Sequence, residues 1–338
     1  MIKQEAAADE ILQEIKSKNF HSVYFLMGEE PYYIDKISNY IQENMLSESE
    51  KDFDLTILYG KDVEISTVIN TAKRFPMIAP YQVVIVKEAQ MISSWENLVY
   101  YLQKPLKSTI LVFCYKYGTP DKRTKWFQET KKAGVVFESG KLYDYQVGEW
   151  IRSYLKTRKT GITQQAENML VDYLGTDLTK IANELDKLLL TKPQDTQQIT
   201  PELIERNIGI SKDYNVFELQ KAFVNRDILK ANRIILYFAE NKKNNPLVLV
   251  LAQLFNFFGN LLLFHYMKDK TEKNIASELK INPFFVKDYQ NAAKIYDREK
   301  TIKVLSLIRE TDARSKGVDN AGIDEGELLK ELVYKILH

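Results

Sequence analysis

Cysteine and histidine are scarce in this chain. Its 338 residues include one cysteine, Cys114, and three histidines. A single cysteine cannot close an internal disulfide, and no CxxC pair or Cys/His cluster occurs, so no structural zinc site or other metal site is expected. Cys114 lies in the apolar run STILVFCYK (108–116). This position predicts a buried thiol that packs as a small hydrophobe.

Catalytic motifs are missing as well. The histidines, His21, His265 and His338, are far apart in the sequence, and neither HExxH nor GxSxG occurs. These two patterns mark zinc peptidases and serine hydrolases, respectively. The sequence therefore predicts no catalytic residues and no cofactor.

A surplus of positive charge is also absent. Lys and Arg number 47 and Asp and Glu 46, which gives a net charge of +1. A protein that holds nucleic acid tightly on its own usually carries a basic excess. One local basic cluster remains, and it is either a contact to DNA phosphates or, as is more common, a solvated charge cluster. Its members are Lys116, Lys122, Arg123 and Lys125.

No signal peptide or membrane span is evident. The N-terminal stretch MIKQEAAADEILQEIKSKN is a polar helical pattern without an apolar core. The longest apolar stretch, 246–267, contains Gln253, Asn256 and Asn260 at helical intervals, and polar groups are costly in lipid. We therefore predict that this stretch is a buried helix of a soluble, cytoplasmic protein with no membrane partner.

Strand and helix patterns alternate throughout residues 20–140. Most of the strand patterns are rich in Val, Ile, Leu and Phe, as expected for strands buried on both faces. The alternation predicts an α/β domain in which helices cover both faces of a parallel sheet. The predicted strands are 21–28, 53–60, 81–88, 108–116 and 134–140.

Helical patterns alone follow after residue 140. Short helices are predicted up to about residue 210; Gly175 ends one of them, and Thr200 with Pro201 begins another. Longer helices dominate from about residue 212. We therefore predict three domains, namely an α/β domain (1–142), a small helical domain (143–211) and a larger all-α domain (212–338).

The stretch FLMGEEPYYIDK (25–36) has the strand–turn–helix context of a P-loop, whose pattern is GxxxxGK[ST]. When the pattern is placed on Gly28, Tyr33 stands where the second glycine belongs, Ile34 where lysine belongs and Asp35 where Ser or Thr belongs. Two glutamates follow Gly28 and place negative charge where phosphates would lie. The sequence thus predicts a degenerate nucleotide site that does not bind nucleotide.

A second feature of P-loop ATPases is incomplete. Such proteins carry an acidic pair after a later apolar strand, which here is YQVVIVKE (81–88). Lys87 replaces the first acid and only Glu88 remains. Glu88 is more simply interpreted as a solvated residue at the end of a strand.

Four stretches, in this order and spacing, resemble the AAA+ clamp-loader family, and most closely the delta subunits of bacterial DNA polymerase III clamp loaders. They cover essentially the whole chain. The stretches are VYFLMGEEPYYIDK, AKRFPMIAPYQVVIVKEA, GTDLTKIANELDKLLL and YNVFELQKAFVNRDILKANRIILYFAENKKNNPLVLVLAQLFNFF.

The resemblance implies an AAA+-like five-stranded parallel sheet domain with a degenerate P-loop, a helical lid and a C-terminal helical collar. It also implies a subunit that does not hydrolyse ATP, grips the beta sliding clamp and opens it for loading onto primed DNA. The collar would pack against the other loader subunits, gamma/tau and delta prime. A polymerase label can attach to such a subunit even though the polymerase active site is elsewhere.

The family's clamp-binding element is a pair of large apolar residues between a helix and the next strand of the first domain. The matching positions are Met77 and Ile78, flanked by Phe75; the family's commoner pair is Leu-Phe, so the aromatic ring is lost here. Pro76 and Pro80 bracket the segment and stiffen it. The alternative is that Met77 and Ile78 simply cap the core, in which case they are buried.

A rival interpretation from another class is a helix-turn-helix DNA-binding protein that uses residues 271–296. In that case Ile281-Asn282-Pro283 forms the turn, and Lys287, Gln290 and Asn291 face the bases. Asp288 and the neutral net charge argue against it. Helix–turn–helix geometry is also common as plain packing.

Overall fold

A five-stranded parallel sheet forms the centre of the first part of the chain. The computed structural model describes residues 3–338 except 194–195, 210, 212, 282 and 320–321. The strand order is β2-β3-β4-β1-β5, and all pairs are parallel. The strands are β1 (Val23–Gly28), β2 (Leu55–Tyr59), β3 (Gln82–Lys87), β4 (Thr109–Lys116) and β5 (Val135–Ser139). All five predicted strands are therefore confirmed, with ends that differ by one or two residues.

One difference, at the start of β2, comes from a helix that the sequence patterns did not predict. Phe53 and Asp54, predicted as strand, are the last residues of helix α3 (Glu48–Asp54). Ser47 and Glu50 form a reciprocal capping box that begins this short helix. The capped helix extends to the first residue of β2 and so shortens the strand.

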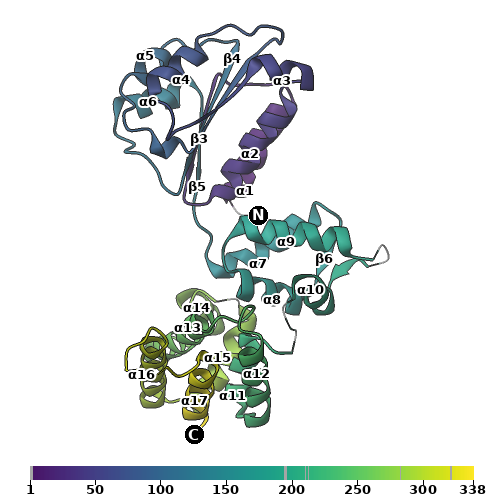
Figure 1. Ribbon diagram of the computed structural model, residues 1–338, viewed down its shortest axis with the longest axis vertical. Coiled ribbons are helices and arrows are strands. Elements are labelled where there is room, and N and C mark those ends of the chain that lie inside the picture. Colours follow the sequence, from purple (N-terminus) through teal and green to yellow (C-terminus); the bar gives the residue numbers. More distant parts are fainter. Residues whose placement is uncertain (1–2, 194–195, 210, 212, 282, 320–321) are drawn as a thin grey trace. The chain divides into compact units, whose positions relative to one another are not determined.

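Helices cover both faces of the sheet (Figure 1). Helices α1 and α2 lie together on one face, whereas α4, α5 and α6 pack on the other. The second face buries an aromatic cluster around Phe25, in which Trp95 and Trp126 stack with ring centroids 4.7 Å apart. These helices are α1 (Lys3–Lys16), α2 (Pro31–Asn44), α4 (Ile65–Ala72), α5 (Leu98–Leu102) and α6 (Lys125–Ala133), with a 3₁₀ turn η1 (Ala89–Met91).

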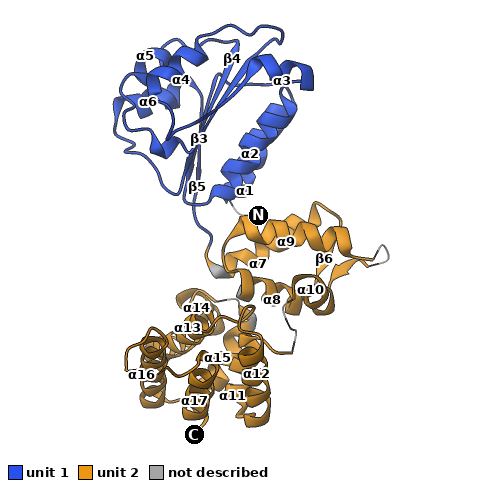
Figure 2. Cartoon of the chain, viewed as in Figure 1, with its two compact units in different colours: residues 1–142 blue, residues 143–338 orange. Residues whose placement is uncertain are grey.

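The chain divides into two compact units, residues 1–142 and 143–338 (Figure 2). The sheet and its helices make up unit 1, and unit 2 is almost entirely helical. The predicted further division at residue 211 lies beside residues 210 and 212, which are outside the described part of the chain, and the three-domain division stays a prediction.

The first helices of unit 2 form a small group closed by a two-stranded parallel ribbon, which the sequence patterns did not reveal because each strand has only two residues. Inside the group, the carboxylate of Glu167, 2% exposed, accepts two hydrogen bonds of 2.6 Å from Arg152. The elements are α7 (Asp144–Lys156), β6 (Gly161–Ile162), α8 (Gln164–Leu174), α9 (Leu178–Thr191), β7 (Gln198–Ile199) and α10 (Pro201–Ile208).

Seven further helices form the larger part of unit 2, which we call the collar (213–338). α13 (Leu247–Tyr266) packs against α16, α15 and α11, and its buried side chains lie in one continuous apolar core. The other helices are α11 (Val216–Asn225), α12 (Ile228–Glu240), α14 (Glu272–Glu278), α15 (Val286–Ile295), α16 (Arg298–Ser315) and α17 (Glu325–Leu337), with a 3₁₀ turn η2 (Pro283–Phe285).

By length and composition alone, α13 could cross a membrane. Eight of its residues, among them Leu254, Phe258 and Leu261, are instead buried in the collar core. The prediction that this stretch is a buried helix is therefore confirmed for one face of α13. The other face is exposed, with Val248, Leu263 and other large apolar side chains outside the core.

Candidate functional site

The segment between α4 and β3 presents three large apolar side chains to solvent. Phe75, Met77 and Ile78 are 75%, 74% and 60% exposed, respectively. The alternative that Met77 and Ile78 cap the core is therefore wrong. Because the strands are parallel and this segment leads into β3, it lies at the edge where the strands begin. The degenerate P-loop, which follows β1, lies at the opposite edge.

The base of this segment, which we call the apolar loop (73–81), is tied to the sheet. The Gln82 side-chain amide donates to the carbonyl of Thr71 at 2.9 Å, and the Thr109 hydroxyl donates to the carbonyl of Ala72 at 2.9 Å. Both bonds join carbonyls in the last turn of α4 to residues at the start of neighbouring strands. The ring of Tyr81 packs edge-to-face on Phe20 at 5.4 Å. The loop thus leaves and re-enters the fold at defined points.

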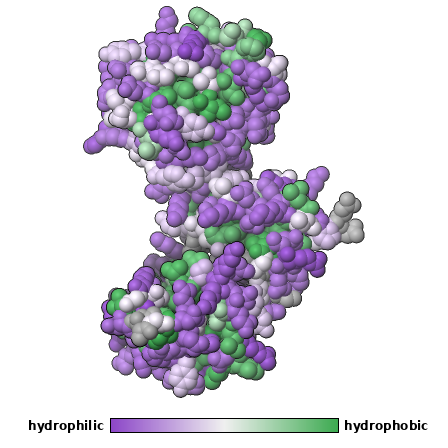
Figure 3. Space-filling view, in the orientation of Figure 1, coloured by the Kyte–Doolittle hydropathy of each residue, from purple (hydrophilic) through white to green (hydrophobic). Residues whose placement is uncertain are grey.

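Apolar side chains also gather beside the neighbouring helix α3. Phe53, the penultimate residue of that helix, is 54% exposed. The space-filling view shows hydrophobic residues at the end of unit 1 where α3 lies (Figure 3). Exposed apolar groups of this kind mark interaction sites more often than chance.

Sequence reasoning missed one residue of this site, Asp54. Its carboxylate is 1% exposed and accepts hydrogen bonds from the backbone N–H groups of Met77, Ile78 and Ala79. The one sequence feature that could have indicated Asp54 is that it is the lone carboxylate in a run (53–60) that otherwise resembles a buried strand. A buried charge requires a partner, but nothing in the sequence indicates that the partner lies more than 20 residues away.

The turn after β1 uses its own groups where a P-loop would bind phosphate. The backbone N–H of Glu29 donates to the carbonyl of Ser139 at 3.0 Å, and the Glu30 carboxylate accepts from the N–H of Tyr32 at 3.0 Å. Glu30 is 4% exposed and caps the start of α2, the position where a helix N-terminus attracts an anion. Gly28 has φ +137°, and a Cβ there would lie 2.0 Å from the Ser139 carbonyl.

The side chains at the degenerate positions either pack in the core or form an internal ion pair. Tyr33 and Ile34 are fully buried in the core. Asp35, at the hydroxyl position, makes an ion pair of 2.6 Å with Lys116 at the end of β4. The positions that would neutralise phosphate and hold Mg²⁺ are thus occupied by packing and by an internal ion pair.

The other predicted nucleotide feature is also incomplete in three dimensions. Lys87 ends β3, and Glu88 follows as an exposed residue with φ +53°. Within the described ranges, no group of three or more His, Cys, Asp or Glu side chains could hold a metal ion. Cys114 is buried as predicted, and burial raises the pKa of its thiol to about 11.

The local basic cluster is largely neutralised by neighbouring carboxylates. Lys116 pairs with Asp35, Lys122 with Glu138 at 2.6 Å, and Arg123 with Asp121 at 2.8 Å. These contacts favour the interpretation of an ordinary surface charge cluster over that of a phosphate-binding face.

The segment of the helix-turn-helix hypothesis belongs to the collar core. Val286, Tyr289 and Ala292 of α15 are buried there, while Lys287 and Asn291 are exposed. Asn282, in the predicted turn, lies outside the described residues. This packing accounts for the helix pair without a role in DNA recognition.

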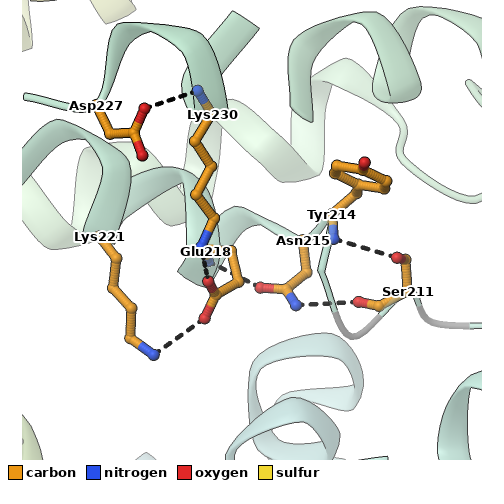
Figure 4. A network of polar contacts seen from close by, with 7 residues as sticks. All are labelled: Ser211, Tyr214, Asn215, Glu218, Lys221, Asp227 and Lys230. Carbon is orange, nitrogen blue, oxygen red and sulfur yellow. Dashed lines mark hydrogen bonds and ion pairs between the residues drawn. The ribbon is translucent and has the colours of Figure 1, made fainter. Parts of the chain in front are cut away.

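A polar network at the start of the collar joins α11 to α12 (Figure 4). The Glu218 carboxylate accepts from Lys221 at 3.0 Å and also from Lys230. Asn215 caps α11 by accepting from the Glu218 N–H, and its amide donates to the carbonyl of Ser211 at 3.0 Å. Burial would raise the pKa of Glu218, but the two lysines outweigh this effect and hold the pKa below its ordinary value.

Two family models match the chain. Residues 24–139 match the model "DNA polymerase III, delta subunit", and residues 213–333 match "DNA polymerase III delta subunit, C-terminal domain". The first match contains the apolar loop and the degenerate P-loop, and the second contains nearly all of the collar.

Two relatives match over almost their whole length. The curated "DNA polymerase III subunit delta" of Bacillus subtilis (strain 168) is 25% identical over 335 residues, covering 96% of this chain and 94% of that protein. The solved structure of the Bacillus subtilis DNA clamp loader delta protein has a TM-score of 0.62 at 25% identity and covers 98% of this chain and 99% of its own. The shared fold therefore extends over both units.

Proposed function

The chain belongs to the family of DNA polymerase III delta subunits, and from this premise we propose that it is the clamp-opening subunit of a clamp loader. In this role it binds the beta sliding clamp, opens the ring and allows the ring to be loaded onto primed DNA during replication. The subunit has no catalytic site of its own. It neither binds nor hydrolyses ATP, which other subunits of the loader use.

The observation that carries this proposal is the exposure of Phe75, Met77 and Ile78 on a loop with a fixed base. Large apolar side chains that enter a pocket of a partner commonly act as interface anchors. A loop that is already ordered loses less conformational entropy when it binds. The three side chains together offer the clamp a compact apolar contact.

The filled P-loop supports the absence of nucleotide chemistry. Glu30 caps the helix that would receive phosphate, and the Asp35–Lys116 pair occupies the position of the metal-binding hydroxyl. Nucleotide binding would require breaking these contacts and placing anionic phosphates beside two glutamates. The AAA+-like domain then serves as a frame for assembly.

The collar is the proposed contact with the gamma/tau and delta prime subunits. Helices α12 and α13 expose several large apolar side chains, and such residues are typical of protein interfaces. They are Leu229, Leu236, Val248, Leu249, Phe255 and Leu263. A weak contact with the backbone of primed DNA and a cytoplasmic location belong to the same proposal.

The direct test is binding of the subunit to an immobilised bacterial sliding clamp by surface plasmon resonance. The Met77→Ala/Ile78→Ala variant is expected to bind at least ~30-fold more weakly than wild type, since the loss of even one anchor of about 2 kcal/mol gives this factor. Both side chains are exposed, so the melting temperature of the variant should match that of wild type.

A matched control is the Met91→Ala/Tyr100→Ala variant, which removes two side chains that are 58% and 74% exposed elsewhere in unit 1. It is expected to bind like wild type. Equal binding by the loop variant and wild type would place the grip elsewhere. A wild-type protein that does not bind the clamp at all would contradict the proposed function.

A further inference from the structure

Asp54 lies directly beneath the apolar loop. It is the last residue of α3, and its side chain reaches three consecutive backbone N–H groups of the loop. Its Oδ1 accepts from Met77 at 2.5 Å, and its Oδ2 accepts from Ile78 at 2.9 Å and from Ala79 at 2.7 Å. The carboxylate is 1% exposed, and Ala79 is also buried.

These three bonds keep the buried carboxylate charged. Burial alone would raise the pKa of Asp54, but the N–H groups of Ala79, Met77 and Ile78 outweigh burial and hold the pKa below its ordinary value. A charge-assisted hydrogen bond is about twice as strong as a neutral one. Three of them at consecutive residues restrict the backbone of the loop far more than any single contact.

The same arrangement determines where the side chains point. The N–H groups of Met77 and Ile78 face inward to Asp54, whereas their side chains are 74% and 60% exposed. Without the anchor, large apolar side chains at a helix–strand junction would turn inward, because burial of their apolar surface lowers the free energy. The carboxylate therefore opposes collapse of the loop onto the core.

We propose that Asp54 is a positioning residue that holds the apolar loop in its clamp-binding conformation before the clamp arrives. This inference rests on the proposed function for its binding consequence. The ordering of the loop in the free protein is independent of that function. The two parts can therefore fail separately, and the experiment measures each of them.

The first measurement is amide hydrogen exchange of the free, full-length protein. In Asp54→Asn the side-chain NH₂ replaces one acceptor with a donor that faces the loop N–H groups. The amides of Met77, Ile78 and Ala79 are expected to exchange at least ~10-fold faster than in wild type. Asp177→Asn is the matched control, because Asp177, the N-cap residue of α9 in unit 2, also accepts a backbone N–H, from Lys180 at 3.0 Å. It should leave exchange in the loop unchanged.

The second measurement is clamp binding by the same variants. If only about a tenth of Asp54→Asn molecules hold the loop open, the apparent Kd rises ~10-fold. The same substitution in the Met77→Ala/Ile78→Ala background should cause no further loss, because the side chains that Asp54 positions are already gone. A merely destabilising substitution would weaken both backgrounds equally.

The outcomes separate the two hypotheses. Faster exchange with weaker, non-additive binding supports the inference. Unchanged exchange in folded Asp54→Asn overturns it, and so does wild-type affinity of that variant for a clamp that wild type binds. If wild type does not bind the clamp, the proposed function fails, while exchange still decides whether Asp54 orders the loop. If Asp54→Asn does not fold, exchange is measured in the wild-type protein alone. Loop amides that exchange there as fast as those of an unstructured chain would overturn the inference, because Asp54 then does not order the loop.

Discussion

Three carboxylates of unit 1 make local contacts at the two edges of the sheet. Glu30 caps α2 and Asp35 pairs with Lys116 at the edge where the strands end. Asp54, at the other edge, holds a loop whose apolar side chains face solvent. In each case a buried or half-buried charge is balanced locally, as the cost of an unpaired buried charge requires.

The degenerate residues after β1 lead to a prediction about nucleotide. Addition of Mg-ATP at millimolar concentration is expected to leave the melting temperature of the wild-type protein unchanged. A ligand present at 100 times its Kd would stabilise the fold by about 2.7 kcal/mol, which differential scanning fluorimetry resolves easily. An Asp35→Thr variant, which supplies the hydroxyl, should also show no shift, because Tyr33 and Ile34 still replace the second glycine and the lysine of the P-loop pattern.

A functional P-loop ATPase serves as the positive control for this measurement. A concentration-dependent rise in melting temperature of the wild-type protein would contradict the proposed absence of nucleotide binding.

The site could be predicted from the sequence only in part. The residue identities at Tyr33, Ile34 and Asp35 were enough to predict a degenerate P-loop. The location of Met77 and Ile78 came from the resemblance to a family, and their clamp-binding role stays a prediction. The anchoring by Asp54 could not be predicted, since a carboxylate does not reveal in sequence which distant N–H groups it meets.

The positions of α3, β2 and β3 explain how Asp54 reaches the apolar loop. The capping box at Ser47 begins α3, and this helix carries Asp54 to the point where the chain enters β2. Because β2 pairs with β3, the end of α3 lies beside the loop that precedes β3. The sequence pattern assigned Phe53 and Asp54 to the strand, and this boundary error concealed the anchor of the candidate site.

The network between α11 and α12 leads to a prediction at the scale of elements. At neutral pH, Glu218→Gln is expected to lower the free energy of unfolding by about 1–2 kcal/mol, because Lys221 and Lys230 lose a charged, partly buried partner. The folded-state pKa of Glu218 is lowered from 4.5. Its contribution is therefore fully present above pH 4.5 and is lost as pH falls through the folded value.

Chemical denaturation at several pH values checks this prediction. The difference between wild type and Glu218→Gln should shrink steadily below pH 4.5. Glu327→Gln is the control, since Glu327 is 62% exposed and pairs with Lys330 in the next helical turn; its effect should stay within about 0.5 kcal/mol. A Glu218 effect that does not change with pH would contradict the electrostatic account.

The molecule as a whole consists of two units with separate apolar cores. Phe113 lies in the core of unit 1 and Phe258 in the collar core of unit 2, and both are fully buried. Proteins with several cores commonly unfold in more than one step. This organisation suits a subunit that binds one partner through unit 1 and others through the collar, as proposed above.

Differential scanning calorimetry tests this organisation. Phe113→Ala and Phe258→Ala are each expected to cost about 3–5 kcal/mol in the core that loses the ring. Phe113→Ala should lower the transition of unit 1, and Phe258→Ala that of unit 2. If both substitutions shift one common transition by the same amount, the units unfold as a single cooperative body.

The sequence by itself determined the five strands of the large sheet, the presence of helices on both of its faces, the mainly helical character of the rest of the chain, the lack of the phosphate-binding residues and the apolar character of the loop. Each of these depends on residue identity and on local periodicity, which reflect burial directly. The tertiary structure alone decided that Met77 and Ile78 face solvent, that Asp35 meets Lys116 across 81 positions, and that Asp54 anchors the apolar loop. The physical reason is that the sequence indicates only that a buried charge needs a partner. Which partner it meets depends on which distant segments the fold brings together.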